Sequence, residues 1–250
     1  MSTSLLPRRI ASRSFPPLGW EFDRLDARPA HAAAAPPTAS AVGFWSAALA
    51  TLLAVAYDVG QIAEWLGWLG SRGGPESSST PLGLAVLLTP SLLLGPAFLV
   101  LLVSLHELTP RARQVWSATA IAFGVAYAVL TGMTYFVQLT LVAPRLSRGD
   151  TRGIETFLFV PFDSFLYAVD ILGYSFMSVA TLFAAQALAG PGLERAARRL
   201  LTTNGLLLPF LVGQMYWHPL IWPAALWAVT FPGATWALAA LFRTRGRVRT

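Results

Sequence analysis

The sequence predicts an all-α, polytopic integral membrane protein, a bundle of about six transmembrane helices with both termini in the cytoplasm. Two observations predict this class. Of the 250 residues, 55% are hydrophobic and only 12% are charged, about half the charged share of an ordinary soluble domain. Several stretches are apolar around their whole circumference, which is typical of helices that contact lipid. The distribution of arginine then predicts the orientation.

Residues 1–41 predict a disordered cytoplasmic tail, because they are rich in Arg, Ala and Pro and lack an apolar run of membrane-spanning length. Apolar blocks follow at about 42–69, 82–105, 115–142, 162–189 and 204–242. One helix crosses the hydrocarbon with about 20 residues. The last block is therefore predicted to form two helices, about 204–219 and 221–242, and residues 243–250 a basic cytoplasmic tail.

All 18 basic residues are arginines. With both termini inside, 14 of them lie in cytoplasmic segments, and four lie in outer loops, namely Arg72, Arg145, Arg148 and Arg152. Cytoplasmic loops carry the excess of basic residues in membrane proteins, so this orientation is predicted. The same distribution explains the net charge of +6 without a nucleic-acid partner. The Arg-, Ala- and Pro-rich usage favours a bacterial source, and hence the bacterial inner (cytoplasmic) membrane.

Several kinds of chemistry are excluded by residue type. The chain contains no cysteine and no lysine, which excludes disulfides, thiolate-ligated metals, thiol nucleophiles and lysine Schiff bases. Its three histidines are scattered and show no paired metal-binding spacing. We therefore assign no catalytic residue and no metal site, and the cofactor is unknown.

Polar and ionisable side chains recur along single faces of the predicted helices. On insertion scales a charged group at a helix centre costs about 2.5–3.5 kcal/mol, so such groups mark functional sites more often than other residues do. In the predicted orientation, several helices place these side chains at one depth, in their outer halves. They are Asp58, Gln61, Glu64, Tyr135, Gln138, Asp163, Tyr167, Asp170, Tyr174 and Gln214. Because lipid rejects such a surface, we expect an acidic, tyrosine-lined, ligand-binding pocket that faces outward.

Two interpretations of the carboxylates stay open. Glu64 and Asp163 lie near the predicted membrane surface, where water can solvate them. Asp58 and Asp170 lie deeper. There a carboxyl group either joins helices through hydrogen bonds or binds an ion, a proton or a ligand.

Two segments carry a resemblance to known sequences. They are TYFVQLTLVAPRL, residues 134–146, and SFLYAVDILGYSFMSVATLFAAQAL, residues 164–188. They resemble a group of uncharacterised bacterial multi-pass integral membrane proteins with a "YFVQLT" helix and an "LGYxxMSxATLFAA" helix. The resemblance covers the third and fourth predicted helices. It implies a membrane fold and no particular activity.

Three functions fit these observations. The first is a protein that binds a small molecule or a cation in the pocket, a transporter included. The second is an accessory or assembly subunit, whose polar faces meet a membrane-protein partner or another copy in a homo-oligomer. The third is an intramembrane enzyme that acts on a lipid or an isoprenoid, which is least favoured because no histidine base or metal cluster is evident. In each case the lipid bilayer is the surrounding partner.

Overall fold

The structure, a computed structural model, describes residues 37–74, 80–160 and 162–247. It is 81% helical, and no strand occurs over these ranges. Five helical segments are long and apolar enough to cross a membrane: Thr38–Trp65, Pro81–Leu108, Arg111–Ser147, Phe165–Ala187 and His218–Gly246. The all-helical class is therefore confirmed.

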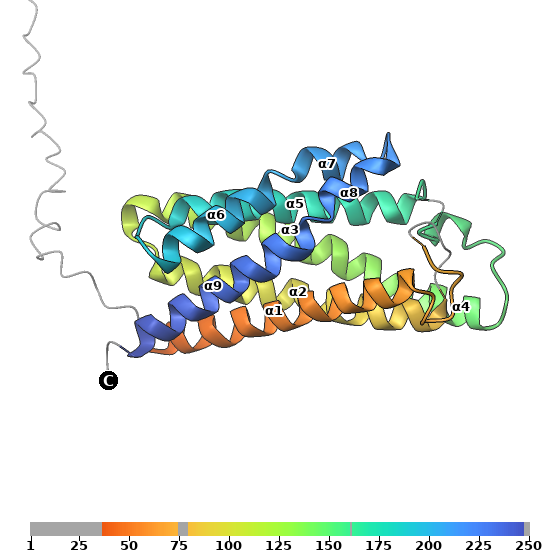
Figure 1. Cartoon of the computed structure of the whole chain (residues 1–250), viewed down its shortest axis with the longest axis horizontal. Coiled ribbons are helices and arrows are strands. Elements are labelled where there is room, and N and C mark those ends of the chain that lie inside the picture. The colour runs from red at the N-terminus through yellow and green to blue at the C-terminus, as the bar shows by residue number, and fades with distance from the viewer. Residues whose placement is uncertain (1–36, 75–79, 161, 248–250) are drawn as a thin grey trace, which may run out of the picture. The chain divides into compact units, whose positions relative to one another are not determined.

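The helices follow one another along the chain with short connections (Figure 1). They are α1 (Pro37–Trp65), α2 (Pro81–Leu108), α3 (Gln114–Val137), α4 (Ala143–Ser147), α5 (Phe165–Ala187), α6 (Leu193–Gly205), α7 (Leu208–Gly213), α8 (Ile221–Ala224) and α9 (Trp227–Arg247). A π-helical turn, Gln138–Val142, joins α3 to α4. Short 3-10 turns occupy Arg111–Arg113, Glu155–Phe157 and His218–Leu220.

The observed helices differ from the predicted ranges mainly in the last third of the chain. Residues 37–41 and 243–247 are helical rather than tail, and the rest of both predicted tails lies outside the described residues. In place of one helix over 204–219, α6 ends at Gly205 and the six-residue α7 follows. Pro209 explains the break, because it has no N–H to donate to the carbonyl four residues earlier. Helix α6 was not predicted from the sequence, because Arg195, Arg198 and Arg199 interrupt the apolar pattern there.

Capping side chains explain where two helices begin. Thr80 Oγ1 accepts the N–H of Gly83 at 3.0 Å at the start of α2. Ser164 Oγ accepts the N–H of Tyr167 at 3.1 Å at the start of α5. Both satisfy an N–H group that the first helical turn leaves without a partner. Because Ser164 is the cap, Asp163 precedes α5 rather than lying on it.

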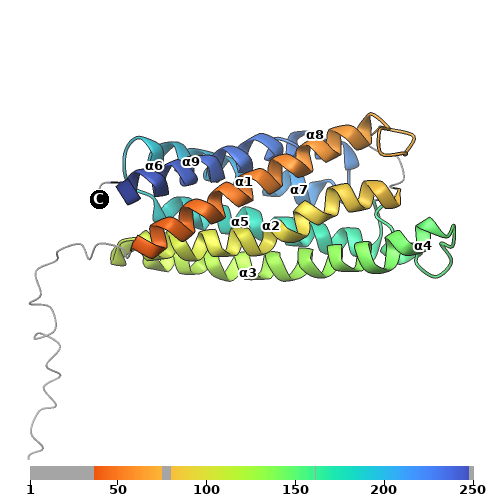
Figure 2. The ribbon, with the colours of Figure 1, turned by 90° about the horizontal axis from the view of Figure 1, so that it is seen from below.

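The long helices form a closed ring in chain order (Figures 1 and 2). α1 packs on α2, α2 on α3, α3 on α5, α5 on α6, α6 on α9, and α9 packs back on α1. Across this last contact, Thr51 Oγ1 lies 2.8 Å from Thr235 Oγ1. We call the end of the ring that holds α4 the α4 end. The opposite end, where α9 finishes, is the C-terminal end.

Aromatic side chains fill the interior of the ring near the C-terminal end. Towards the α4 end, a different set of helices surrounds the interior. The ring of Phe98 packs against those of Tyr127 and Phe231, with centroids 6.0 and 5.4 Å apart, and all three side chains are buried. Towards the α4 end, α6 stops at Gly205, and the short helices α7 and α8 take its place (Figure 1). The candidate site lies where these short helices replace a long one.

Candidate functional site

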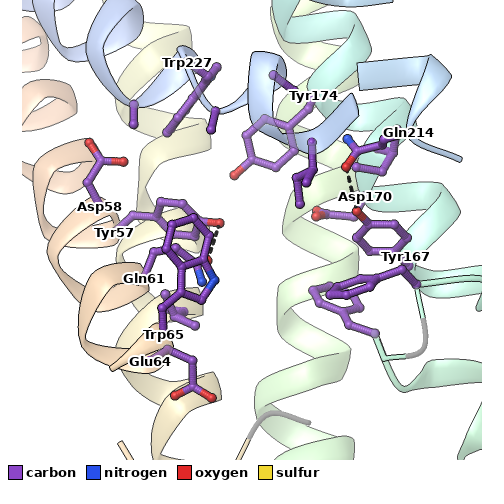
Figure 3. Close-up of a pocket in the computed structure, with 18 of the residues that line it drawn as sticks. Tyr57, Asp58, Gln61, Glu64, Trp65, Tyr167, Asp170, Tyr174, Gln214 and Trp227 are labelled. Atoms are coloured by element: carbon purple, nitrogen blue, oxygen red, sulfur yellow. Dashed lines mark hydrogen bonds between the residues drawn. The ribbon is translucent and has the colours of Figure 1, made fainter. Parts of the chain in front are cut away.

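A cavity of about 420 Å³ lies inside the ring towards the α4 end. Its walls come from α1, α2, α3, α5, α7, α8, α9 and the segment before α5 (Figure 3). Eight of the ten predicted site residues line it: Asp58, Gln61, Glu64, Tyr135, Tyr167, Asp170, Tyr174 and Gln214. The helices therefore bring together most of the side chains that spacing and depth had selected.

The other two predicted residues, Gln138 and Asp163, do not line the cavity. Gln138 is buried, and its Nε2 donates a 2.5 Å hydrogen bond to the carbonyl of Phe157. It thereby holds the loop that follows α4. Asp163 is exposed in the segment before α5. Its spacing from Tyr167 suggested a helical stripe, but the helix begins only after Ser164.

The α1 wall carries Asp58, Gln61 and Glu64 (Figure 3). Tyr57 Oη donates a hydrogen bond of 3.2 Å to Gln61 Oε1, one turn further along the helix. Asp58 is half-buried beside this pair. This wall therefore presents fixed polar groups over more than one helical turn.

Glu64 lies against the start of a neighbouring helix. Its side chain is 4% exposed, and neither carboxylate oxygen has a hydrogen-bond partner among the described residues. It packs over Gly83, where an added Cβ would lie 2.6 Å from Oε2. Gly83 is in the first turn of α2, and the positive end of the helix dipole stabilises a carboxylate there. The first turn of α2 therefore offsets part of the cost of burying this charge.

The α5 wall carries Tyr167, Asp170 and Tyr174 (Figure 3). Tyr167 Oη donates to Gln214 Oε1 of the α7 segment at 3.0 Å. Tyr135 Oη of α3 donates to Tyr174 Oη at 2.9 Å. These two bonds fix the orientation of the tyrosines on either side of Asp170.

Asp170 lacks the compensation that Glu64 has. It is 7% exposed, and its Oδ1 is buried without a hydrogen-bond partner in the part of the chain that the structure describes. It is the sixth residue of α5, and the effect of a helix dipole falls off beyond the first turn. A buried carboxylate oxygen without a partner is costly, so Oδ1 can accept a hydrogen bond or pair with a positive charge from outside the described residues.

Three aromatic rings form a box in the cavity wall. The rings of Tyr57 and Tyr174 both stand at 86° to that of Trp227, with centroids 6.0 and 5.6 Å away. Trp227 is held in place, because its Nε1 donates to Met177 Sδ at 3.4 Å and its ring stacks on Phe231. All three rings of the box line the cavity.

Further aromatic residues surround the cavity towards the α4 end. Tyr167 contacts Phe159 and Phe162, and Phe162 stacks on His218 with centroids 4.4 Å apart. On the opposite side, the rings of Trp65 in α1 and Trp222 in α8 lie 5.6 Å apart. These aromatic contacts join segments that are distant in sequence around the cavity.

We infer that the cavity reaches the surface beside two of its lining side chains, one in α1 and one in α8. Ile62 of α1 and Trp222 of α8 both line it, yet they are 54% and 55% exposed. Most other lining side chains are buried or half-buried. Both side chains are on the outside of the bundle, close to the α4 ends of their helices.

The charge of the lining is of one sign. Asp58, Glu64 and Asp170 contribute carboxyl groups, and the lining drawn from the described ranges includes no arginine or histidine. No group of three His, Asp or Glu residues in these ranges could hold a metal ion. The arrangement can therefore bind an apolar body through its aromatic rings and a positive charge through its carboxylates.

Comparisons with protein-family models, with curated proteins and with solved structures found no match.

The tyrosines Tyr135, Tyr167 and Tyr174 were predicted from the sequence, but the tryptophans and phenylalanines of the site were not. Trp65, Trp222 and Trp227 are three of nine tryptophans, and tryptophan is common wherever membrane helices meet the interface. Phe159 and Phe162 lie in a loop, whose path no helical periodicity encodes. Tyr57 was not among the predicted site residues, although its position in the sequence carried a signal, since it precedes Gln61 by one helical turn.

Proposed function

We propose that this chain is a six-crossing protein of the bacterial cytoplasmic membrane that binds a small organic molecule or cation in the cavity. In this proposal both termini are cytoplasmic, and the α4 end faces the outer side. Transport is a role that such a site can serve, because it lies inside the helix ring.

The distribution of arginine supports this orientation. Arg111, Arg195 and Arg243 are near the C-terminal end of the ring, whereas Arg145 and Arg148 are at the α4 end. Cytoplasmic loops carry most arginines, so the C-terminal end is assigned to the cytoplasm. The path of α6 and α7 from the C-terminal end towards the α4 end supports a fifth, broken crossing (Figure 1).

One observation carries the proposed binding function: a single cavity combines a mostly aromatic and aliphatic wall with a few convergent polar groups. Its volume of about 420 Å³ is within the range of roughly 300–1,000 Å³ that is typical of small-molecule sites. Membrane proteins rarely keep carboxylates within their helices unless these face a cavity or a partner. Asp58 and Asp170 meet this description.

The test is to purify the full chain in native lipid and to identify every molecule that remains bound by native mass spectrometry. We expect a small molecule that is lost when Ala228→Phe fills the cavity. Val229→Phe is the matched control, because Val229 is on the same helix but is 69% exposed and does not line the cavity. A stoichiometric protein partner, together with equal small-molecule content in both variants, would overturn the proposal in favour of an accessory subunit.

A further inference from the structure

Resting on the proposed function, we infer that the ligand is an amphiphilic organic cation, an amine or quaternary ammonium with an apolar body. Its positive head lies between Asp170 and the aromatic box of Tyr57, Tyr174 and Trp227. Its apolar body extends towards the opening between α1 and α8.

The sign of the charge follows from Asp170. Of the two carboxylates that are more than nine-tenths buried, Glu64 is stabilised by the first turn of α2, whereas Asp170 is not at a helix end. Its Oδ1 is buried without a hydrogen-bond partner among the described residues. Arginine and histidine are likewise missing from the described part of the cavity lining. A cationic ligand supplies the countercharge that this carboxylate lacks.

The organic nature of the cation follows from the aromatic box. The perpendicular rings of Tyr57 and Tyr174 flank Trp227, and aromatic faces attract ammonium groups through cation–π interactions. Cages of this kind recognise quaternary ammonium groups. A small hard metal ion instead prefers six or more oxygen ligands. Such a set is not assembled in the described ranges, because Asp170 is on the α5 wall whereas Asp58 and Glu64 are on the α1 wall (Figure 3).

The amphiphilic character follows from the position of the opening. Ile62 and Trp222 line the cavity and are also exposed on the side of the bundle. In this inference, a ligand enters there from the bilayer rather than from bulk water. A molecule with an apolar body and a charged head concentrates at that boundary.

The experiment compares two probes of the same shape and opposite charge. Tetraphenylphosphonium and tetraphenylborate are titrated into the full chain in lipid nanodiscs, with empty nanodiscs subtracted, and benzyltrimethylammonium serves as a smaller cation. We expect saturable binding of at least one cation and none of the borate. Asp170→Asn is expected to weaken cation binding by about tenfold or more. Glu155→Gln, which removes an exposed loop carboxylate, leaves it unchanged.

The outcomes separate this inference from the proposed function. If the borate binds as well as the cations, or if Asp170→Asn binds the cations normally, the cationic class is wrong. The proposed function then stands as long as Ala228→Phe still abolishes binding. If no probe of either charge binds saturably, and the purified chain carries no small molecule, both proposals fail. A thermal unfolding curve for Asp170→Asn that matches the parent chain excludes misfolding as the cause of lost binding.

Discussion

The carboxylate of Glu64, at the end of α1, lies directly over Gly83 in the first turn of α2. The absence of a side chain at residue 83 is what makes room for the carboxylate, and the helix N-terminus makes its burial tolerable. One residue pair thus fixes both the spacing of α1 and α2 and the place of a charge at the cavity edge.

The pair predicts a strong coupling between two substitutions. In a helix, Gly→Ala normally stabilises by about 0.5–1 kcal/mol. In the parent chain we expect Gly83→Ala to give no such stabilisation, because the added methyl group displaces the Glu64 carboxylate. In a Glu64→Ala background we expect Gly83→Ala to stabilise the protein by the usual amount. Unfolding in a denaturing detergent measures the double-mutant cycle. Additive effects of the two substitutions would show that the side chains do not share this space.

A second glycine, Gly205, allows α5 and α6 to approach each other closely. A Cβ at Gly205 would lie 2.7 Å from the backbone carbonyl oxygen of Ser178, which cannot move without the helix. We expect Gly205→Ala to lower the free energy of unfolding by about 1–3 kcal/mol. Gly132→Ala is the control, since nothing lies within 4 Å of its added Cβ. Equal effects of both substitutions would contradict the close packing.

A buried hydrogen-bond network joins α5, α6 and α9. Asn204 Nδ2 donates to Thr181 Oγ1 at 3.3 Å, and Thr230 donates to Asn204 Oδ1 at 2.9 Å. Interhelical hydrogen bonds in membranes average about 0.6 kcal/mol, so Asn204→Leu is expected to cost about 1 kcal/mol. The loss stays small because both threonines also contact carbonyls of their own helices. Unfolding in a denaturing detergent measures this loss of free energy, and Thr140→Val at an exposed site is the control. An Asn204→Leu variant as stable as the parent chain would show that these hydrogen bonds do not stabilise the fold.

Glu194, outside the five membrane-length helices, predicts a pH-dependent stability. Burial alone would raise the pKa of Glu194, but hydrogen bonds from the N–H groups of Gly190 and Ala189 and the charge of Arg245 bring this pKa below its usual value. Its stabilising effect is therefore complete above the unfolded-state pKa of about 4.3. It is lost as the pH falls through the lower folded-state pKa.

We therefore expect Glu194→Gln to lower the thermal midpoint at neutral pH. The difference from the parent chain should shrink as the pH falls below about 4. Glu107→Gln, an exposed carboxylate at the same end of the ring, is the matched control. A difference that stays constant over this pH range would mean that Glu194 acts through packing rather than charge.

The six-crossing topology can be tested by labelling, because the chain contains no cysteine and single cysteines report their side without background. In intact cells, a membrane-impermeant maleimide is expected to label Ser147→Cys and Tyr216→Cys. Ala112→Cys and Ala196→Cys should react only after permeabilisation. All four parent residues are exposed. If Ala196→Cys and Tyr216→Cys react from the same side, α6 and α7 do not cross the membrane.

Periodicity and depth predicted most of the polar side chains that line the cavity, but not the places of Gln138 and Asp163. Tyr167, Asp170 and Tyr174 recur at helical spacing, and the structure places all three on the cavity wall. Asp163 fits the same spacing but precedes the helix, because the cap at Ser164 decides where the helix begins. Helical spacing predicts a shared face only for residues that are in one helix.

The aromatic part of the site depends on tertiary packing. Trp227 lines the cavity because α9 begins there and packs on α1, and the sequence of α9 alone does not indicate that contact. The break between α6 and α7 has a local cause in Pro209, but the sequence does not indicate which helices surround the space beside it. Without that break, a long helix would occupy the space in which the cavity lies.

The contact between α1 and α9 also bears on how the protein is made. Helices enter the membrane in chain order, so the ring cannot close until its final segment has been synthesised. Until then, the face of α1 that carries Thr51 and Asp58 is not covered by α9, and it contacts lipid or an insertion chaperone instead. A nascent chain arrested before Trp227 is therefore an open arc in which the partner of Thr51 in α9 is still missing.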